Sequence, residues 1–419
     1  SLRQDESSRF GANNRKADFY SVGALWKIKE ESFLKDVKWL SGLALKASTG
    51  TSGNSAIGNY QSQALVGNGQ FDGATTFAVS TPGNANLAWE TQQKTTIGVR
   101  ANFLDKINVE LEYYNRVTDN MLINVPFPFT AGFTSITSNV GSLKNSGIDL
   151  AISFDILKKN KHNAYITPYV NYNYNKNEIT ELFQGRDFYI IPNTGVSWAV
   201  GEPVAFFYPV FSGINPTNGN AEWFRPNPDP TQIARNRQDP NDVTSVFNTA
   251  ALQQNTGIDR YPPHNGGFGF ASGFEGFFLS ADFSFSAGKY LINNDQYFFA
   301  NPSVFGGFNQ SEIVRDYWKQ PGDNARFPRY GVQFSQFDSR LIQNASFMRL
   351  KTLNFGYQIP AKFLQKATNV VKGAKLFVVG RNLLTFTEYQ GPDPEVDSNI
   401  GLGTNPNTKQ LSFGLELKF

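Results

Sequence analysis

Side chains that could do chemistry are sparse in this chain of 419 residues. It has no cysteine, so a disulfide, a thiolate metal site and a thiol nucleophile are all excluded. Its two histidines are His162, in a basic KKNKH turn, and His264, in Pro-Pro-His-Asn. Neither has an H-x-x-x-H partner or a carboxylate pair at ligand spacing. We interpret both as solvated loop residues and expect no metal, no cofactor and no enzymatic activity.

Two further patterns are weak as functional signals. The glycine-rich stretch NGGFGFASGFEGF (265–277) lacks the G-x-G-x-x-G spacing of a nucleotide-binding loop. We interpret its glycines as lumen-facing small residues in strands or as turn residues. Acidic patches lacking the EF-hand pattern are weak Ca²⁺ candidates, and we expect their carboxylates to be solvated. These patches are Asp229, Asp239 and Asp242, and Asp393, Glu395 and Asp397.

Aromatic residues in the long polar segments are the better candidates for ligand contact, because flat rings stack on sugars and pack on peptide side chains. The predicted substrate-binding residues are Trp198, Phe206, Phe207, Tyr208, Trp223, Phe224, Tyr261, Trp318 and Tyr330. For any single ring, the favoured alternative is a role in holding the loop's own fold or in an interfacial aromatic girdle. For the set, contact with a ligand or partner is expected, because loops on a rigid scaffold usually carry function.

The elements that would position these rings are long strands, since apolar and polar residues alternate strictly over many segments. The last ten residues, QLSFGLELKF, put Leu411 and Phe413 on one face and Gln410 and Ser412 on the other. The same alternation predicts a tight hairpin over 93–114. About eleven strands are predicted: 18–28, 38–48, 92–104, 106–118, 145–157, 163–175, 265–274, 276–288, 346–358, 374–383 and 409–419.

Strand length and connection length together indicate a membrane barrel. Several predicted strands run 10–12 residues, beyond the ~5–6 of most soluble proteins and close to the ~9–11 that a tilted membrane strand needs. Short connections alternate with long polar ones, as outer-membrane barrels do with periplasmic turns and extracellular loops. The short connections are 29–37, 105, 158–162, 275 and 359–373, and the long ones are 49–91, 119–144, 176–264, 289–345 and 384–408. The fold class predicted is all-β, a transmembrane antiparallel β-barrel with long extracellular loops; the alternative is a large soluble β protein.

Composition excludes other classes and sets the expected place of the chain in the barrel. Lys and Arg number 38 against 35 Asp and Glu, so there is no basic face for nucleic acid. The sequence contains no run of 18 apolar residues, so no membrane helix is predicted. A mean hydropathy of −0.37 is compatible with a membrane barrel, because only every second residue of a strand faces lipid. The polar opening, SLRQDESSRFGANNRK, carries no signal peptide, so we interpret the sequence as a fragment or processed product. The first and last predicted strands run in the same direction, and in an even-stranded barrel whose first and last strands pair this requires an odd number of strands upstream. We also expect the last strand to close the barrel, with its Leu411-to-Phe419 face toward lipid.

Several segments resemble a known family in collinear order. They include SSRFG (7–11), LAWET (87–91), NVGSLKNSGIDL (139–150), GRNLLTFTEYQGPDPEV (380–396) and the final FGLELKF. In this combination the chain resembles SusC/RagA-type TonB-linked (TonB-dependent) outer-membrane transporters along essentially its whole length. The stretch 380–396 is the most specific, and Asp149 stands where the family usually has Glu.

The resemblance implies energised import of large nutrients, oligosaccharides or peptides, across the outer membrane of a Gram-negative, Bacteroidota-like bacterium. The implied partners are a SusD-like surface lipoprotein, TonB, outer-membrane lipid and a second transporter–lipoprotein pair, but no nucleic acid. Residues 1–419 would form the C-terminal portion of a barrel of ~22 strands. The plug, TonB box and N-terminal domain of the family are absent from this chain. We expect 176–264 and 289–345 to contact ligand and lipoprotein.

Two alternatives stay open on the sequence. One is a passive, porin-like barrel, and the other is a siderophore-type receptor without a lipoprotein lid. A plug and TonB box separate active import from diffusion, and dependence on a SusD-like protein separates the two kinds of receptor.

Overall fold

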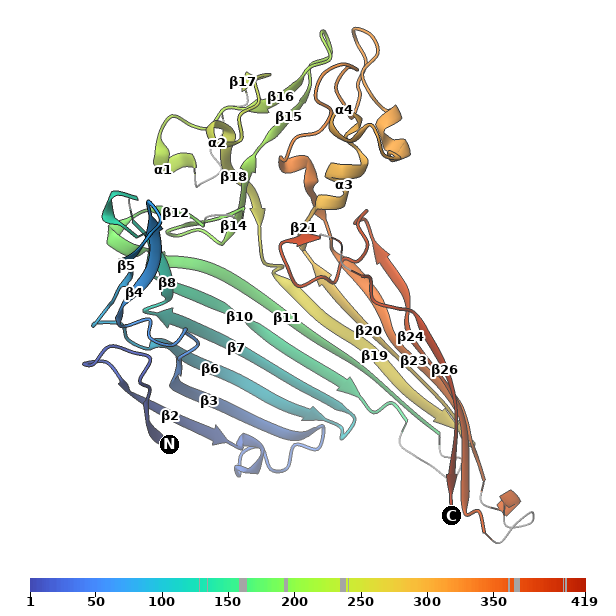
Figure 1. The fold of residues 1–419 in the computed structure, drawn as a ribbon. Helices are drawn as coiled ribbons and strands as arrows, with labels where there is room; N and C mark the ends of the chain where they lie inside the picture. The colour runs from blue at the N-terminus through green and yellow to red at the C-terminus, as the bar shows by residue number, and fades with distance from the viewer. Residues whose placement is uncertain are drawn as a thin grey trace.

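One twisted antiparallel sheet of twelve strands dominates the part of the chain that the computed structural model describes (Figure 1). The described residues are 1–127, 129–133, 135–157, 164–191, 195–233, 239, 241–360, 362–364, 370–401, 403 and 405–419. In spatial order the strands are β1 (Leu2–Glu6), β2 (Lys16–Trp26), β3 (Leu40–Asn54), β6 (Glu90–Phe103), β7 (Ile107–Asp119), β10 (Ser142–Phe154), β11 (Tyr165–Glu181), β19 (His264–Phe274), β20 (Phe277–Ala287), β23 (Phe347–Ile359), β24 (Gly373–Thr387) and β26 (Gln410–Lys418).

The eleven predicted strands are confirmed, with ends within four residues except that β3 and β11 each extend six residues beyond the predicted 38–48 and 163–175, and β1 is a twelfth strand that the prediction lacked. Its sequence, LRQDE, has almost no apolar residues, so it carries no alternation signal. It is recruited by pairing with β2, where Leu2 lies opposite Tyr20. Because β1 is antiparallel to β2, the first and last strands of the described twelve-stranded sheet, β1 and β26, run in opposite directions, so the premise of the expected odd number of strands upstream is wrong.

The register places all the apolar rows on one face of the sheet, which we call the apolar face. Directly paired residues of adjacent strands point to the same side. Leu415 of β26 lies opposite Leu376 of β24, which lies opposite Tyr357 of β23. At the other end of the sheet, Ile97 and Tyr113 form such a pair. Leu411, Phe413, Leu415 and Leu417 all lie on this face, as predicted, and are exposed.

The opposite face, called the polar face, carries charged and amide side chains. Lys46 of β3 reaches across β6 to form ion pairs with Glu110 and Glu112 of β7. Gly98 of β6 makes this reach feasible, because a Cβ there would lie 2.9 Å from both Lys46 Cε and Glu112 Cγ. Polar side chains thus satisfy one another along the wall rather than pointing singly into open space.

Glycines of the polar face are covered by aromatic rings from the neighbouring strand. Five directly opposed pairs share this arrangement: Tyr114–Gly147, Tyr165–Gly273, Tyr169–Gly269, Phe278–Gly356 and Phe377–Gly414. A Cβ at Gly356 would lie 2.3 Å from the Phe278 ring, and one at Gly414 would lie 2.2 Å from the Phe377 ring. Two of these glycines belong to the glycine-rich stretch interpreted above as lumen-facing small residues.

The connections differ at the two ends of the sheet, as predicted. At one end, β19 and β20 are joined by Glu275 and Gly276 alone, both with positive φ, which is the geometry of a tight hairpin turn. At the other end the long segments form structures of their own (Figure 1). Two hairpins lie there, β4 (Ala64–Phe71) with β5 (Ala74–Pro82), and β8 (Leu122–Pro126) with β9 (Ser135–Asn139).

Three small sheets and short helices complete the long segments. The sheets are β12 (Phe188–Ile191), β13 (Val196–Ala199), β14 (Ala205–Pro209) and β18 (Gln253–Asp259); β15 (Phe211–Ile214), β16 (Ala221–Phe224) and β17 (Val243–Thr244); and β22 (Ile342–Asn344), β21 (Tyr290–Asn293) and β25 (Ile400–Gly401). The helices are η1 (Ile28–Glu30), η2 (Phe129–Ala131), η3 (Phe183–Gly185), α1 (Pro230–Ile233), α2 (Thr249–Leu252), α3 (Asn294–Phe299), α4 (Pro302–Phe305), η4 (Glu312–Arg315) and η5 (Ser339–Leu341). Among the described residues, none of the helices has the length and apolar character needed to cross a membrane.

Candidate ligand-contacting loops

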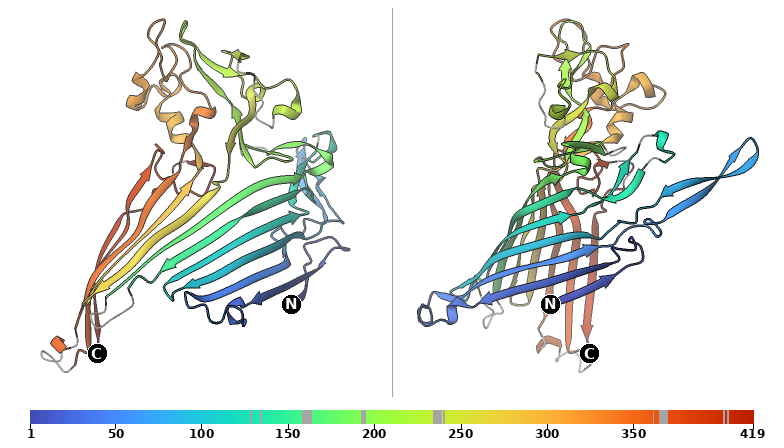
Figure 2. Two further views of the ribbon diagram at one scale, coloured as in Figure 1. Left: turned by 180° about the vertical axis from the view of Figure 1, so that it is seen from behind. Right: turned by 90° about the vertical axis from the view of Figure 1, so that its left-hand side faces the viewer.

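Three long segments fold together into one unit beyond the end of the sheet, which we call the loop body. It consists of the described residues of 182–263, 288–346 and 388–409, and both views of Figure 2 show it standing beyond the same end of the sheet. A shared apolar core joins the segments, since Phe206 and Ile292 belong to one buried cluster and Ile400 of the third segment packs against it. The loop body is therefore a packed structure that can hold side chains in fixed positions.

Three of the predicted contact residues lie inside the loop body. Phe206, Phe207 and Trp223 are only 0%, 1% and 3% exposed. Trp223 packs against Phe247 at 4.9 Å between ring centroids, and its Nε1 donates a hydrogen bond of 2.8 Å to Asp338 Oδ2. In this structure these rings hold the fold of the loops, which is the alternative weighed for single rings above.

Three other predicted residues, Trp198, Tyr208 and Tyr261, line one pocket of the loop body. Its volume is about 350 Å³, and its wall includes residues of all three segments, such as Ile292 and Ile400. Burial raises the pKa of Tyr208 to about 12, so its hydroxyl stays protonated at neutral pH. The pocket therefore presents aromatic faces and the neutral hydroxyl group of Tyr208.

One charged residue, Arg260, also lines this pocket. Its guanidinium carbon lies 5.1 Å from the centroid of the Tyr261 ring. Burial lowers the pKa of Arg260, and the charges of Tyr261 and Asp397 act in the opposite direction. Sequence reasoning missed Arg260, and its position directly before Tyr261 was the only available signal.

The remaining predicted residues, Phe224, Trp318 and Tyr330, lie farther along the loop body. Phe224 is half-buried at the end of β16. Trp318 rests on Gly219, where a Cβ would lie 2.4 Å from its ring, and its Nε1 donates to the Pro216 carbonyl at 3.0 Å. Tyr330 is 77% exposed. Of the nine predicted residues, the structure thus brings Trp198, Tyr208 and Tyr261 together, and for the accessible rings ligand contact stays a prediction.

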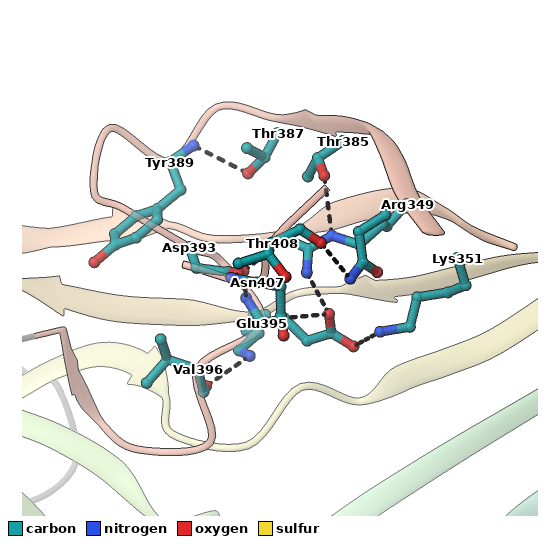
Figure 3. A network of polar contacts seen from close by, with 12 residues as sticks. Arg349, Lys351, Thr385, Thr387, Tyr389, Asp393, Glu395, Val396, Asn407 and Thr408 are labelled. Carbon is teal, nitrogen blue, oxygen red and sulfur yellow. Dashed lines mark hydrogen bonds and ion pairs between the residues drawn. The ribbon is translucent and has the colours of Figure 1, made fainter. Parts of the chain in front are cut away.

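A buried ion-pair network anchors the last segment of the loop body to the sheet (Figure 3). Arg349 of β23 donates to Asp393 Oδ1 at 2.6 Å and to Glu395 Oε2 at 2.5 Å, while its Nε donates to Thr385 Oγ1 of β24 at 2.9 Å. Lys351 donates to the other oxygen of Glu395 at 2.6 Å. We call these four charged residues, Arg349, Lys351, Asp393 and Glu395, the loop anchor.

Backbone amides complete the coordination of Asp393. The amides of Glu395 and Asn407 donate to its two oxygens at 2.9 and 2.7 Å. Burial acts to raise the pKa of Asp393, but the hydrogen bonds from Arg349 and the two amides outweigh it and hold that pKa below its usual value. Asp393 is therefore ionised at neutral pH and ties both ends of the segment 393–407 to Arg349.

A bulge in β23 positions the cations of the loop anchor. The ladder shifts register between Leu350 and Thr352 on both sides of β23. Leu350 and Leu353 consequently both lie on the apolar face, with Lys351 placed on the polar side between them. The bulge was not predicted, although the three-residue spacing of Leu350 and Leu353 breaks the two-residue alternation and was the available signal.

Two expectations from the sequence are wrong in detail. Asp393 and Glu395 are not solvated carboxylates, since they are bound by Arg349 and Lys351. His264 is not a free loop residue, because it begins β19, is half-buried, and its Nδ1 lies 2.7 Å from the Tyr172 hydroxyl. His162 lies outside the described residues. Among the described residues no group of His, Asp and Glu has a geometry that could hold a metal ion.

Comparison with known proteins gives a consistent result. Residues 1–240 match the family model described as TonB dependent receptor-like, beta-barrel. The chain is 30% identical to TonB-dependent receptor P3 of Formosa agariphila over all of its own length and 43% of that protein. It is 29% identical to TonB-dependent receptor SusC of Bacteroides thetaiotaomicron, over all of this chain and 42% of that protein.

A solved structure extends the likeness to three dimensions. The chain superposes on the structure of the RagAB peptide transporter with a TM-score of 0.89 and 40% identity, covering all of this chain and 45% of the other. The chain therefore spans less than half the length of the relatives that it matches. The twelve-stranded sheet, the loops gathered at one end and a family model matched over more than half of the residues agree, and the chain belongs to the TonB-dependent receptor-like β-barrel family.

Proposed function

We propose that this chain forms the C-terminal portion of a transporter that imports large nutrients across the outer membrane together with a SusD-like lipoprotein. The observation that carries the proposal is similarity to the RagAB peptide transporter at 40% identity over all of this chain and 45% of the other. In this reading TonB acts through a plug that lies upstream in the family, and two transporter–lipoprotein pairs associate as a dimer. No step requires catalysis by this chain.

The two faces of the sheet suit the two environments of a membrane barrel. The apolar face would meet lipid, and the polar face would line the lumen. Strands β1 and β26 each have only one neighbour within the described sheet. Unpaired backbone groups cost several kcal/mol each in hydrocarbon, so further strands of the whole barrel would pair with these two edges.

The loop body would contact both ligand and lipoprotein. Its packed core supplies a rigid base, while accessible rings such as Trp198, Tyr261 and Tyr330 supply contact surfaces. Oligosaccharides and peptides both bind aromatic surfaces, and the name of the RagAB transporter favours peptides for that protein. We propose peptides or oligosaccharides as the substrate class of this chain.

The test begins with an affinity pull-down of the full-length protein from its native outer membrane in mild detergent, with mass spectrometry of everything retained. The proposal predicts a longer polypeptide with plug sequence and a co-purifying SusD-like lipoprotein. A barrel of 46.6 kDa alone, without plug or lipoprotein, would refute energised import and favour a passive porin. A plugged barrel without the lipoprotein would favour a siderophore-type receptor.

Point variants then test the role of the loop body. Tyr330→Ala removes a ring there that is 77% exposed, while Phe363→Ala removes a ring that is 55% exposed from the β23–β24 connection at the other end of the sheet. The proposal predicts weaker lipoprotein binding or slower uptake for Tyr330→Ala combined with Trp318→Ala. Equal binding and uptake in this double variant and in Phe363→Ala would contradict the assignment.

A further inference from the structure

We propose that the pocket lined by Trp198, Tyr208, Arg260 and Tyr261 binds a carboxylate group of the imported ligand, with Arg260 as its partner. The inference rests on the proposed function, because it names the chemistry of the ligand at the loop body. The ligand class is a carboxylate on a flat or apolar body. A peptide C-terminus and an acidic sugar both fit this description.

The shape and lining of the pocket fit such a group. A volume of about 350 Å³ holds one amino-acid residue or one sugar ring rather than a whole oligomer. Val204, Ile292 and Ile400 give an apolar wall, and the three aromatic residues give flat surfaces. A small number of polar groups in a mainly apolar cavity is the usual composition of a ligand site.

Arg260 is the feature that the fold itself does not explain. Two guanidinium groups with little exposure near the loop body are paired, Arg349 with Asp393 and Glu395, and Arg340 with Asp338 at 2.7 Å. Among the described residues Arg260 forms no ion pair or side-chain hydrogen bond, and its guanidinium group lies over the ring of Tyr261. Asp397 affects its pKa through charge alone, and that carboxylate is exposed.

A half-buried, unpaired guanidinium at a cavity wall favours an anion from outside the chain. Guanidinium is planar and remains charged in proteins, and its parallel N–H groups match the two oxygens of a carboxylate. The contact with the Tyr261 ring holds the guanidinium group at the cavity wall without occupying its N–H groups in an ion pair. The aromatic residues would then hold the body of the residue that carries the carboxylate.

The experiment measures binding by calorimetry to the purified full-length transporter with its lipoprotein. The probes are N-acetyl-L-phenylalanine, its carboxamide and D-glucuronic acid, and the variants are Arg260→Gln, Arg260→Lys and the control Arg315→Gln, which removes an exposed arginine of η4. We expect one or both carboxylate probes to bind, and the carboxamide to bind at least about tenfold more weakly. Arg260→Gln should reduce carboxylate binding to a similar degree, Arg260→Lys should reduce it less, and Arg315→Gln should not change it.

The outcomes separate the inference from the function on which it rests. Binding of N-acetyl-L-phenylalanine alone would identify a peptide terminus, and binding of glucuronic acid alone would identify an acidic sugar. Equal binding of carboxylate and carboxamide, no binding of any probe, or unchanged binding in Arg260→Gln would each overturn the inference. Uptake that depends on the lipoprotein and on TonB, and yet is unaffected by Arg260→Gln, would support the proposed function. That result would contradict only the carboxylate site.

Discussion

Replacing Arg349 by methionine should release the last segment of the loop body while leaving the sheet assembled. Methionine keeps much of the side-chain volume but removes the hydrogen bonds to Asp393, Glu395 and Thr385. Removing one partner of a buried ion pair typically costs about 3–5 kcal/mol, because the other charge is left uncompensated. Asp393 would keep its two backbone amide donors, and Glu395 would keep Lys351, so we expect the lower end, about 3 kcal/mol.

This free energy is the difference between the anchored and released states of the segment. A change of about 3 kcal/mol corresponds to roughly a hundredfold rise in the released population. Hydrogen exchange read by mass spectrometry on peptides covering 389–401 and 405–409 measures that population directly, because exchange reports local opening. Amides of 393, 395 and 407 should show the largest acceleration, and peptides from β23 and β24 should change little.

The matched control is Arg381→Met on β24. Arg381 is exposed and, among the described residues, its side chain has no ion pair. It should therefore leave exchange in 389–409 unchanged. If Arg349→Met and Arg381→Met gave the same exchange rates in this segment, the loop anchor would not hold the segment, and the reasoning from burial and charge would fail.

Three further predictions address pH, the polar face and the loop core. The folded-state pKa of Asp393 lies below its ordinary 3.8, so the stability that its ionised form contributes is present above pH 3.8 and is lost as the pH falls below that value. Hydrogen exchange in 389–409 should therefore be the same at pH 7 and pH 5 after correction for intrinsic exchange rates. Faster corrected exchange at pH 5 than at pH 7 would argue against this assignment. Gly414→Val pushes a side chain into the Phe377 ring and should lower the free energy of unfolding by about 1–3 kcal/mol, which would appear as a heat-induced gel shift of the folded barrel at a lower temperature. Adding Phe377→Ala should recover part of this stability. Additive effects of the two substitutions would contradict the pairing of ring and glycine. Trp223→Phe removes the donor to Asp338 and should cost about 1–3 kcal/mol within the loop body, measured as faster proteolysis of 182–263; wild-type proteolysis rates would show that this hydrogen bond is not needed.

The main sheet was predictable because its signal is local. A strand between lipid and a polar lumen must alternate apolar and polar side chains at every residue. The sequences of stretches such as 410–418 and 277–287 therefore predict both that they are strands and which side chains lie on the apolar face. Strand β1 was not predicted, because its five residues are nearly all polar and show no alternation. The small strands of the loop body, such as β17 with two residues, carry no period and exist only because their neighbours pack them.

The loop anchor and the pocket were out of reach for a related reason. Arg349 lies 44 residues from Asp393 in the chain, and an arginine in a polar-face position looks ordinary. The acidic side of the anchor was noticed as a cluster, but its partner could not be chosen without the geometry. Likewise, the rings Phe207 and Tyr208 are adjacent in sequence, yet one is buried and the other lines the pocket, which only tertiary packing decides.

The aromatic rings that cover glycines on the polar face have a consequence for passage through the barrel. Each ring lies over the backbone of the next strand, as at Phe278 on Gly356 and Tyr165 on Gly273, so it runs along the wall instead of projecting from it. In the proposed barrel these five large side chains would lie close to the wall, and the clearance for a plug or cargo would be set mainly by the backbone. At Gly356 and Gly414, where the ring is the nearest neighbour of an added Cβ, even a methyl group would displace the ring from this position and, in the proposed barrel, toward the lumen.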